Sequence, residues 1–168
     1  MSKNVRNAEL ESKEPSDDGT SYNVILLMRH PDIDPGEVTR EFGLTPHVAF
    51  RKGCVRTLQN GKKLPGVSRD SRWNHVYRFS KDRRVGDALA QVVTFLEGHK
   101  TFIKKLCLHG ASFELYVQLP GATNMGDSIS WELLRRMSQL RVSLGIEVFP
   151  RLDGSWRSSS GVSRVDEL

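Results

Sequence analysis

A histidine and two carboxylates stand close together near the start of the chain, at His30, Asp32 and Asp34. Side chains of these types bind metal ions or transfer protons when they face a common substrate. Asp34 precedes Pro35, however, and this pair is typical of a helix start, where the aspartate caps the first turn. The helix start explains Asp34 without chemistry. An enzyme that uses His30, Asp32 and His75 therefore ranks third among the functions considered.

No other pattern in the sequence predicts catalysis. The remaining histidines, His47, His99 and His109, lack the spacing of paired metal ligands. Cys54 and Cys107 lie far apart and form no CxxC motif. The sequence has no glycine-rich phosphate loop between a strand and a helix, and no GxSxG motif. We expect no catalytic residue, no metal and no cofactor.

The distribution of charge is the most informative feature of the sequence. The net charge is +5, the first 21 residues carry −2 and the last 18 carry none, so the middle of the chain carries +7. Most of this charge falls in residues 47–84, where aromatic residues, Phe50 among them, are interleaved with the basic ones. The basic residues there are Arg51, Lys52, Arg56, Lys62, Lys63, Arg69, Arg72, Arg78, Lys81, Arg83 and Arg84, against only Asp70 and Asp82.

Three interpretations of this basic segment are open. The charges are solvated on a loop and a strand edge, they meet an acidic protein partner, or they follow a phosphate backbone while rings stack on bases. A solvated surface is the commonest outcome, and among binding functions a protein partner is favoured over nucleic acid. The candidate binding surface comprises Arg51, Lys52, Arg56, Lys62, Lys63, Arg69, Arg72, Trp73, His75 and Tyr77.

Apolar periodicity predicts the elements that position these residues. Trp73, His75, Tyr77 and Phe79 alternate along a half-buried strand, with the Trp73 ring expected to lie buried between the sheet and a helix. The other expected elements are a strand over 22–29, a helix from Pro35 to Gly43, an extended segment over 44–55, a polar loop through Gly61, Pro65 and Gly66, a helix from Val85 broken at Gly98, a strand over 113–119, a helix capped by Asp127 or Ser128, and a strand over 144–148.

This order, β-α-β-β-α-β-α-β, predicts an α+β domain with a mostly antiparallel sheet and helices on one face, a ferredoxin-like variant. The domain is expected over residues 21–151, between disordered tails at 1–20 and 152–168, which lack apolar periodicity. The longest apolar run is too short to cross a bilayer, and no secretory signal is evident. We therefore expect a cytoplasmic protein with reduced cysteines.

Several short motifs resemble those of the bacterial family DUF4279, a domain of unknown function. They are Ile33-Asp34-Pro35-Gly36-Glu37-Val38, Phe42-Gly43-Leu44-Thr45-Pro46, Arg51-Lys52-Gly53, the strand that opens at Trp73, and the helix-to-strand segment from Leu140 to Phe149. The chain departs from the pattern at Cys54, where an acidic residue is expected. The resemblance implies a small bacterial cytoplasmic domain and implies no reaction.

We interpret the chain as a non-enzymatic protein-interaction module, of the immunity or accessory type, that binds its partner through the basic loop and the neighbouring strand. A nucleic-acid-binding accessory protein that uses residues 47–84 is the second hypothesis. The analogy to immunity proteins concerns size and the lack of catalytic motifs, and no particular residue carries it.

Overall fold

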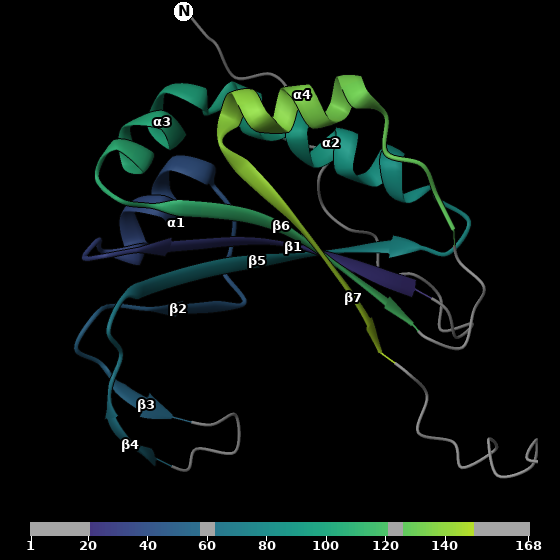
Figure 1. Cartoon of the computed structure of the whole chain (residues 1–168). Coiled ribbons are helices and arrows are strands. Elements are labelled where there is room, and N and C mark those ends of the chain that lie inside the picture. The colour runs from purple at the N-terminus through teal and green to yellow at the C-terminus, as the bar shows by residue number, and fades with distance from the viewer. Residues whose placement is uncertain (1–20, 58–62, 121–125, 150–168) are drawn as a thin grey trace, which may run out of the picture.

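Helices cover one face of a five-stranded sheet, and a two-stranded hairpin hangs from the opposite side (Figure 1). The computed structural model describes residues 21–57, 63–120 and 126–149. Its elements are β1 (Ser21–His30), α1 (Pro35–Phe42), β2 (Val48–Phe50), β3 (Val55–Thr57), β4 (Lys63–Val67), β5 (Ser71–Ser80), α2 (Val85–Gly98), α3 (Lys100–Leu108), β6 (Ser112–Pro120), α4 (Trp131–Leu140) and β7 (Val142–Phe149). None of the described helices has the length and hydrophobicity that crossing a membrane requires. Both expected tails lie outside the described residues.

The main sheet has the order β2-β5-β1-β6-β7, with β1 at its centre. β1 pairs antiparallel with β5 and with β6, and β2 pairs antiparallel with β5. β7 instead runs parallel to β6. After β6 ends, α4 carries the chain back to the end of the sheet at which β6 began, and β7 starts from there. The α+β class is confirmed. The sheet is nevertheless mixed, and its strand order does not confirm the ferredoxin-like arrangement.

Alternation along the strands separates the two faces of the sheet. On the helix side of β1, Tyr22, Val24, Leu26 and Met28 are almost fully buried. Their partners across the ladders include Trp73, Tyr77 and Phe79 on β5, and Phe113, Leu115 and Val117 on β6. The prediction that Trp73 is buried is confirmed, since its side chain is 0% exposed.

Phe42, at the end of α1, is the point where most aromatic rings of the core meet. Its ring lies 5.5 Å from the Trp73 ring, measured between centroids, and edge-on to it. It makes similar contacts with Phe95 and His99 on the α2 side and with Phe102 of α3. The Trp73 indole N–H donates to Thr39 Oγ1 at 3.0 Å, so α1 is fixed to β5 by both packing and a hydrogen bond.

The helix boundaries follow local signals with one exception. Asp34 caps α1, Pro35 is its first residue, and Gly43 ends it in the left-handed conformation, as predicted. The prediction that Asp127 or Ser128 caps the third helix is wrong, because Ser130 accepts the capping bond from Leu133. Asp127 accepts instead from the Gly86 N–H at 2.9 Å, in the first turn of α2. A carboxylate there satisfies a free N–H and favours the helix dipole.

The hairpin β3–β4 lies where the sequence predicted a polar loop. β4 contains Pro65 and Gly66, which normally argue against a strand. The pairing of Val55 with Val67 is followed by an irregularity before Thr57 pairs with Lys63, so the hairpin lacks the regular alternation from which strands are predicted.

Replacement of Trp73 by alanine is expected to lower the free energy of unfolding by about 3–5 kcal/mol, as large truncations in a core do. Trp73→Phe keeps a ring against Phe42 and loses the bond to Thr39, so its cost should be clearly smaller. Chemical denaturation of the two variants measures both values. A Trp73→Ala variant as stable as the parent would contradict the packing described here.

The Asp127 carboxylate predicts an acid-dependent part of stability. The Gly86 N–H, followed by the Arg84 guanidinium 2.8 Å away, lowers the pKa of Asp127 to about 2. Because the folded pKa lies below the ordinary value, this stabilisation is present above about pH 4 and is lost as the pH falls toward about 2. The stability difference between the parent and Asp127→Asn should therefore be largest near neutrality and shrink over that acidic range. Urea unfolding at a series of pH values tests this, and a constant difference would contradict it.

Candidate functional site

The face of the sheet opposite the helices has no helical cover among the described residues (Figure 1). Along β1 this face carries Ile25 and Leu27, which are half-buried. β5 contributes Val76 and β6 contributes Tyr116, both also half-buried. The helix-free face is thus a partly apolar surface rather than a fully polar one.

The β3–β4 hairpin is fastened to one end of this face by a small set of bonds. The Lys52 N–H donates to Ser71 Oγ at 3.0 Å, and Ser71 is the one fully buried polar residue of the described core. Beyond it, the Gly53 N–H donates to the Ser68 carbonyl, and the Ser68 N–H donates to the Cys54 carbonyl, each at 2.9 Å. Gly53 has φ +83°, which other residues rarely adopt, so the chain can leave the sheet edge there.

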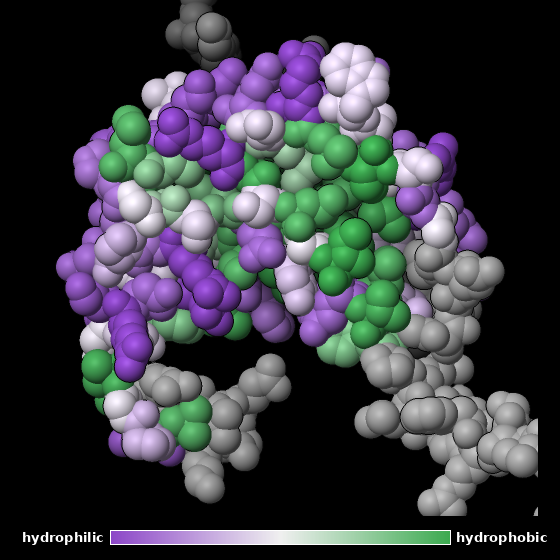
Figure 2. Space-filling model, in the orientation of Figure 1, coloured by the Kyte–Doolittle hydropathy of each residue, from purple (hydrophilic) through white to green (hydrophobic). Residues whose placement is uncertain are grey.

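A hollow of about 640 Å³ lies between the hairpin and the sheet. Figure 2 shows the hairpin standing away from the body, with open space beneath the sheet. We call this hollow the hairpin cleft. It is lined by Phe50, Val55, Leu64, Val67, Ser68, Arg69, Asp70 and Arg72.

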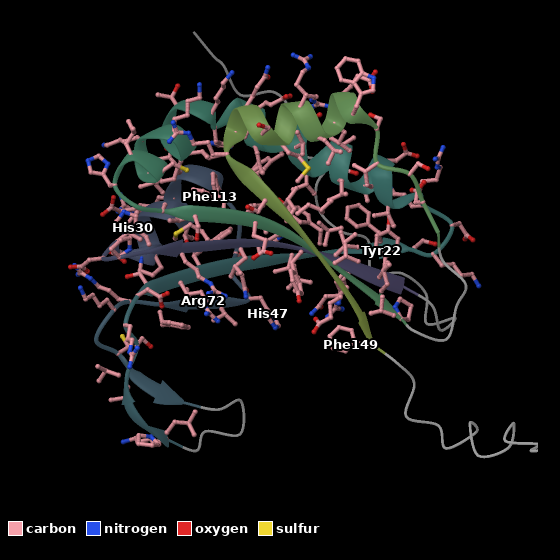
Figure 3. All side chains as sticks on the ribbon, viewed as in Figure 1. Tyr22, His30, His47, Arg72, Phe113 and Phe149 are labelled. Carbon is pink, nitrogen blue, oxygen red and sulfur yellow. The ribbon has the colours of Figure 1, made fainter. Side chains whose placement is uncertain are left out.

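Arg72 is the most unusual residue of the hairpin cleft. Its guanidinium carbon lies 5.7 Å from the centre of the Phe50 ring. Its Nε atom is buried and has no hydrogen-bond partner among the described residues. Figure 3 places it on the helix-free side of the sheet, opposite to Phe113, which faces the helices. A buried donor without an acceptor is costly to the folded domain.

A second arginine stands directly across the ladder. Arg29 on β1 pairs with Arg72 on β5, and like charges in directly opposed positions destabilise a sheet. Arg69 lines the same cleft. No ion pair within the described residues involves Arg29, Arg69 or Arg72. The hairpin cleft is therefore lined by two arginines without an ion-pair partner among the described residues, Arg69 and Arg72, and by one carboxylate, Asp70.

The rest of the predicted surface does not gather at this cleft. Arg51 is exposed and pairs with Asp32 at 3.4 Å. Lys52 and Lys63 are exposed, Arg56 lies on β3, and Lys62 lies outside the described residues. The basic residues Lys81, Arg83 and Arg84 follow the far end of β5, which is about 26 Å from Arg72 at the rise of an extended strand. The segment 47–84 is therefore several separate patches.

Trp73, His75 and Tyr77 do not belong to an exposed binding surface, and their assignment to one needs correction. Trp73 and Tyr77 are buried on the helix side. The His75 ring shares that side and forms a hydrogen bond through Nδ1 with the Thr45 carbonyl at 2.7 Å. Because side chains alternate along β5, the arginine at position 72 faces the cleft when the tryptophan at 73 faces the core.

The predicted His30–Asp32–His75 site is not assembled. His30 Nδ1 accepts the Asp32 backbone N–H at 3.0 Å, while the Asp32 carboxylate faces Arg51. Burial, followed by the nearby His109, lowers the pKa of His30 and so favours its neutral form. His75 lies across the ladder from Leu26, four residues along β1 from His30. Within the described ranges no group of three or more metal-binding side chains comes together.

The sequence matches the model of a known family. The profile of the family described as a domain of unknown function (DUF4279) matches residues 20–149, which include every described helix and strand. The chain belongs to this family. No curated protein and no solved structure matches it significantly.

The sequence reasoning missed Arg29 and the apolar walls of the hairpin cleft. Arg29 lies outside the basic segment, and only the register of β1 against β5 brings it opposite Arg72. Val55, Leu64 and Val67 belong to the hairpin that was predicted as a loop. The available signal was the pair Arg69 and Arg72 around a strand start.

Replacement of Arg72 by methionine keeps an unbranched chain over Phe50 and removes both the unpaired donor and the opposed charge. The free energy of unfolding should stay unchanged or rise by up to about 1 kcal/mol. Arg78→Met is the matched control, since Arg78 shares the strand and face but lies opposite Asn23. Chemical denaturation measures both. A loss of more than about 1 kcal/mol in Arg72→Met alone would mean that the folded domain itself uses the charge.

Proposed function

We propose that the chain is a non-enzymatic protein-interaction module that binds an acidic segment of a partner protein in the hairpin cleft. The observation that carries this proposal is Arg72, whose Nε is buried and unpaired beside the Phe50 ring. An accessory or immunity-type role fits such a module, because binding alone would be its activity.

The chemistry of the cleft favours a carboxylate next to an apolar side chain. A guanidinium can donate two parallel hydrogen bonds to one carboxylate, and the stacked Phe50 ring limits the orientations that Arg72 can take. The half-buried Leu64 and the exposed Val67 offer apolar contact beside it. Asp70 disfavours a dense run of acidic residues, so a mixed acidic and apolar segment suits the cleft best.

Two features favour a protein partner over nucleic acid. A backbone-tracking site needs cations at regular intervals along one groove, whereas the basic residues here fall into patches at both ends of β5. Arg51, the basic residue next to β2, is also engaged with Asp32. Nucleic-acid binding stays the second hypothesis. The enzyme hypothesis has less support, because His30, Asp32 and His75 face different partners.

The experiment compares three fluorescein-labelled probes in anisotropy titrations at low and near-physiological salt. The first is a peptide that alternates glutamate with leucine, the second has glutamine in place of glutamate, and the third is a single-stranded oligonucleotide. The glutamate peptide should bind best and retain binding at the higher salt. Amide chemical shifts in the labelled protein should change around residues 50 and 69–72.

Two variants locate the binding. Arg72→Met should weaken the glutamate peptide at least tenfold, which corresponds to about 1.4 kcal/mol. Arg83→Met is the matched control, because Arg83 also lies over a phenylalanine, Phe79, at 5.4 Å but at the opposite end of β5. Equal binding by both variants would falsify the assignment to the hairpin cleft. Submicromolar oligonucleotide binding at physiological salt would place the nucleic-acid hypothesis first.

A further inference from the structure

The outer edge of β7 has no strand partner among the described residues. β7 is the last strand of the sheet and pairs with β6 without interruption from Val142 to Phe149. Edge strands normally carry lysine, proline or a bulge, which block pairing with another chain. The described strand has none of these, and Glu147 is its one charged residue. Its free backbone groups are open to another strand.

The helix side of this edge is also apolar. Ile146 and Val148 are 60% and 57% exposed. Ile146 and Val148 line a groove of about 620 Å³ together with Val117, Leu119 and Ile129. Figure 2 shows apolar surface gathered below α4 on the side where β7 runs (Figure 1). Contiguous exposed apolar surface of this kind marks an interaction site.

The sequence of β7 matches itself when it is reversed. Residues 142–148 read Val-Ser-Leu-Gly-Ile-Glu-Val, which is symmetric about Gly145 in the placement of apolar side chains. An antiparallel pair of two such strands, centred on Gly145, sets Val142 opposite Val148 and Leu144 opposite Ile146. All four side chains share the helix-facing side, because they alternate with the polar ones.

The charges agree with the same register. Glu147 lies opposite Ser143 of the other strand, so no like charges face each other. The exposed Arg141 directly precedes β7 and ends α4 in the left-handed conformation, so it lies outside the paired strand. Gly145, at the centre of the strand pair, has no side chain, and the Tyr116 ring of the same chain fills the space where a side chain at position 145 would lie.

We propose that β7 pairs antiparallel with β7 of a second copy of this chain, about a two-fold axis at Gly145. The pairing joins the two five-stranded sheets into one continuous sheet, with both helix layers on the same side. It covers Ile146 and Val148, and it brings the two α4 helices, with their exposed Trp131 and Leu134, to the same side of the seam. This interface is separate from the hairpin cleft.

The molar mass of the full chain in solution tests the proposal. Light scattering behind size exclusion at concentrations on the order of 10 and 100 µM should give twice the chain mass of 19.0 kDa. Val148→Lys should weaken dimerisation at least tenfold. Leu108→Lys is the control, since Leu108 is 75% exposed at the end of α3, and it should dimerise like the parent. A monomeric parent at the higher concentration, or a Val148→Lys variant that dimerises normally, overturns the proposal.

Cross-linking tests the register. In a Cys54→Ser background, Ser143→Cys and Glu147→Cys chains are prepared separately, mixed and oxidised. A disulfide should form between the two different chains, because these positions face each other across the pair. Disulfides that form only between identical chains would overturn the two-fold at Gly145. Pairing of β7 with a strand of another protein, with no self-association, would likewise replace the second copy as its partner.

Discussion

The contact between Phe42 and Trp73 is the interaction on which the rest of the structure depends. It joins the end of α1 to β5, and the Phe42 ring also reaches side chains of α2 and α3. Burial of Trp73 fixes which face of β5 points to the helices. Because the strand alternates, it also fixes Arg72 and Asn74 on the opposite face, beside β2. The position of the cationic cleft therefore follows from a hydrophobic contact on the other side of the sheet.

Features set by neighbouring residues were predictable from the sequence, and features set by distant ones were not. Asp34, Pro35 and Gly43 define α1 locally, and the alternation from Trp73 to Phe79 defines β5. Asp127 was assigned to the helix that follows it, yet it bonds to Gly86, which precedes it by 41 residues. The parallel direction of β7 depends on the strand order, and so does the pairing of Arg29 with Arg72. No short stretch of the sequence specifies the strand order.

The basic segment shows how composition differs from a surface. Eleven basic residues between positions 47 and 84 suggested one binding face. In the fold, Arg51 forms an ion pair with Asp32. Arg83 and Arg84 lie beyond the far end of β5, where Arg84 forms an ion pair with Asp127. Of the described basic residues of that segment, only Arg69 and Arg72 line the cleft, and Arg29 from outside the segment lies opposite Arg72 on β1. Strand register and the positions of strand ends decide which charged residues meet at a site. The number of charged residues along a stretch of sequence is therefore a poor guide to the charge of a site.

The attachment of the β3–β4 hairpin has a consequence for how this fold can diversify. The described residues of the hairpin contribute nothing to the buried core, and a few backbone bonds together with the Ser71 hydroxyl fasten the hairpin to the sheet. Mutation, insertion or grafting within it would reshape one wall of the cleft while the Phe42–Trp73 core keeps the fold intact. The hairpin can therefore vary in sequence while Arg72 and Phe50, which form the opposite wall of the cleft, stay in place on strands of the main sheet.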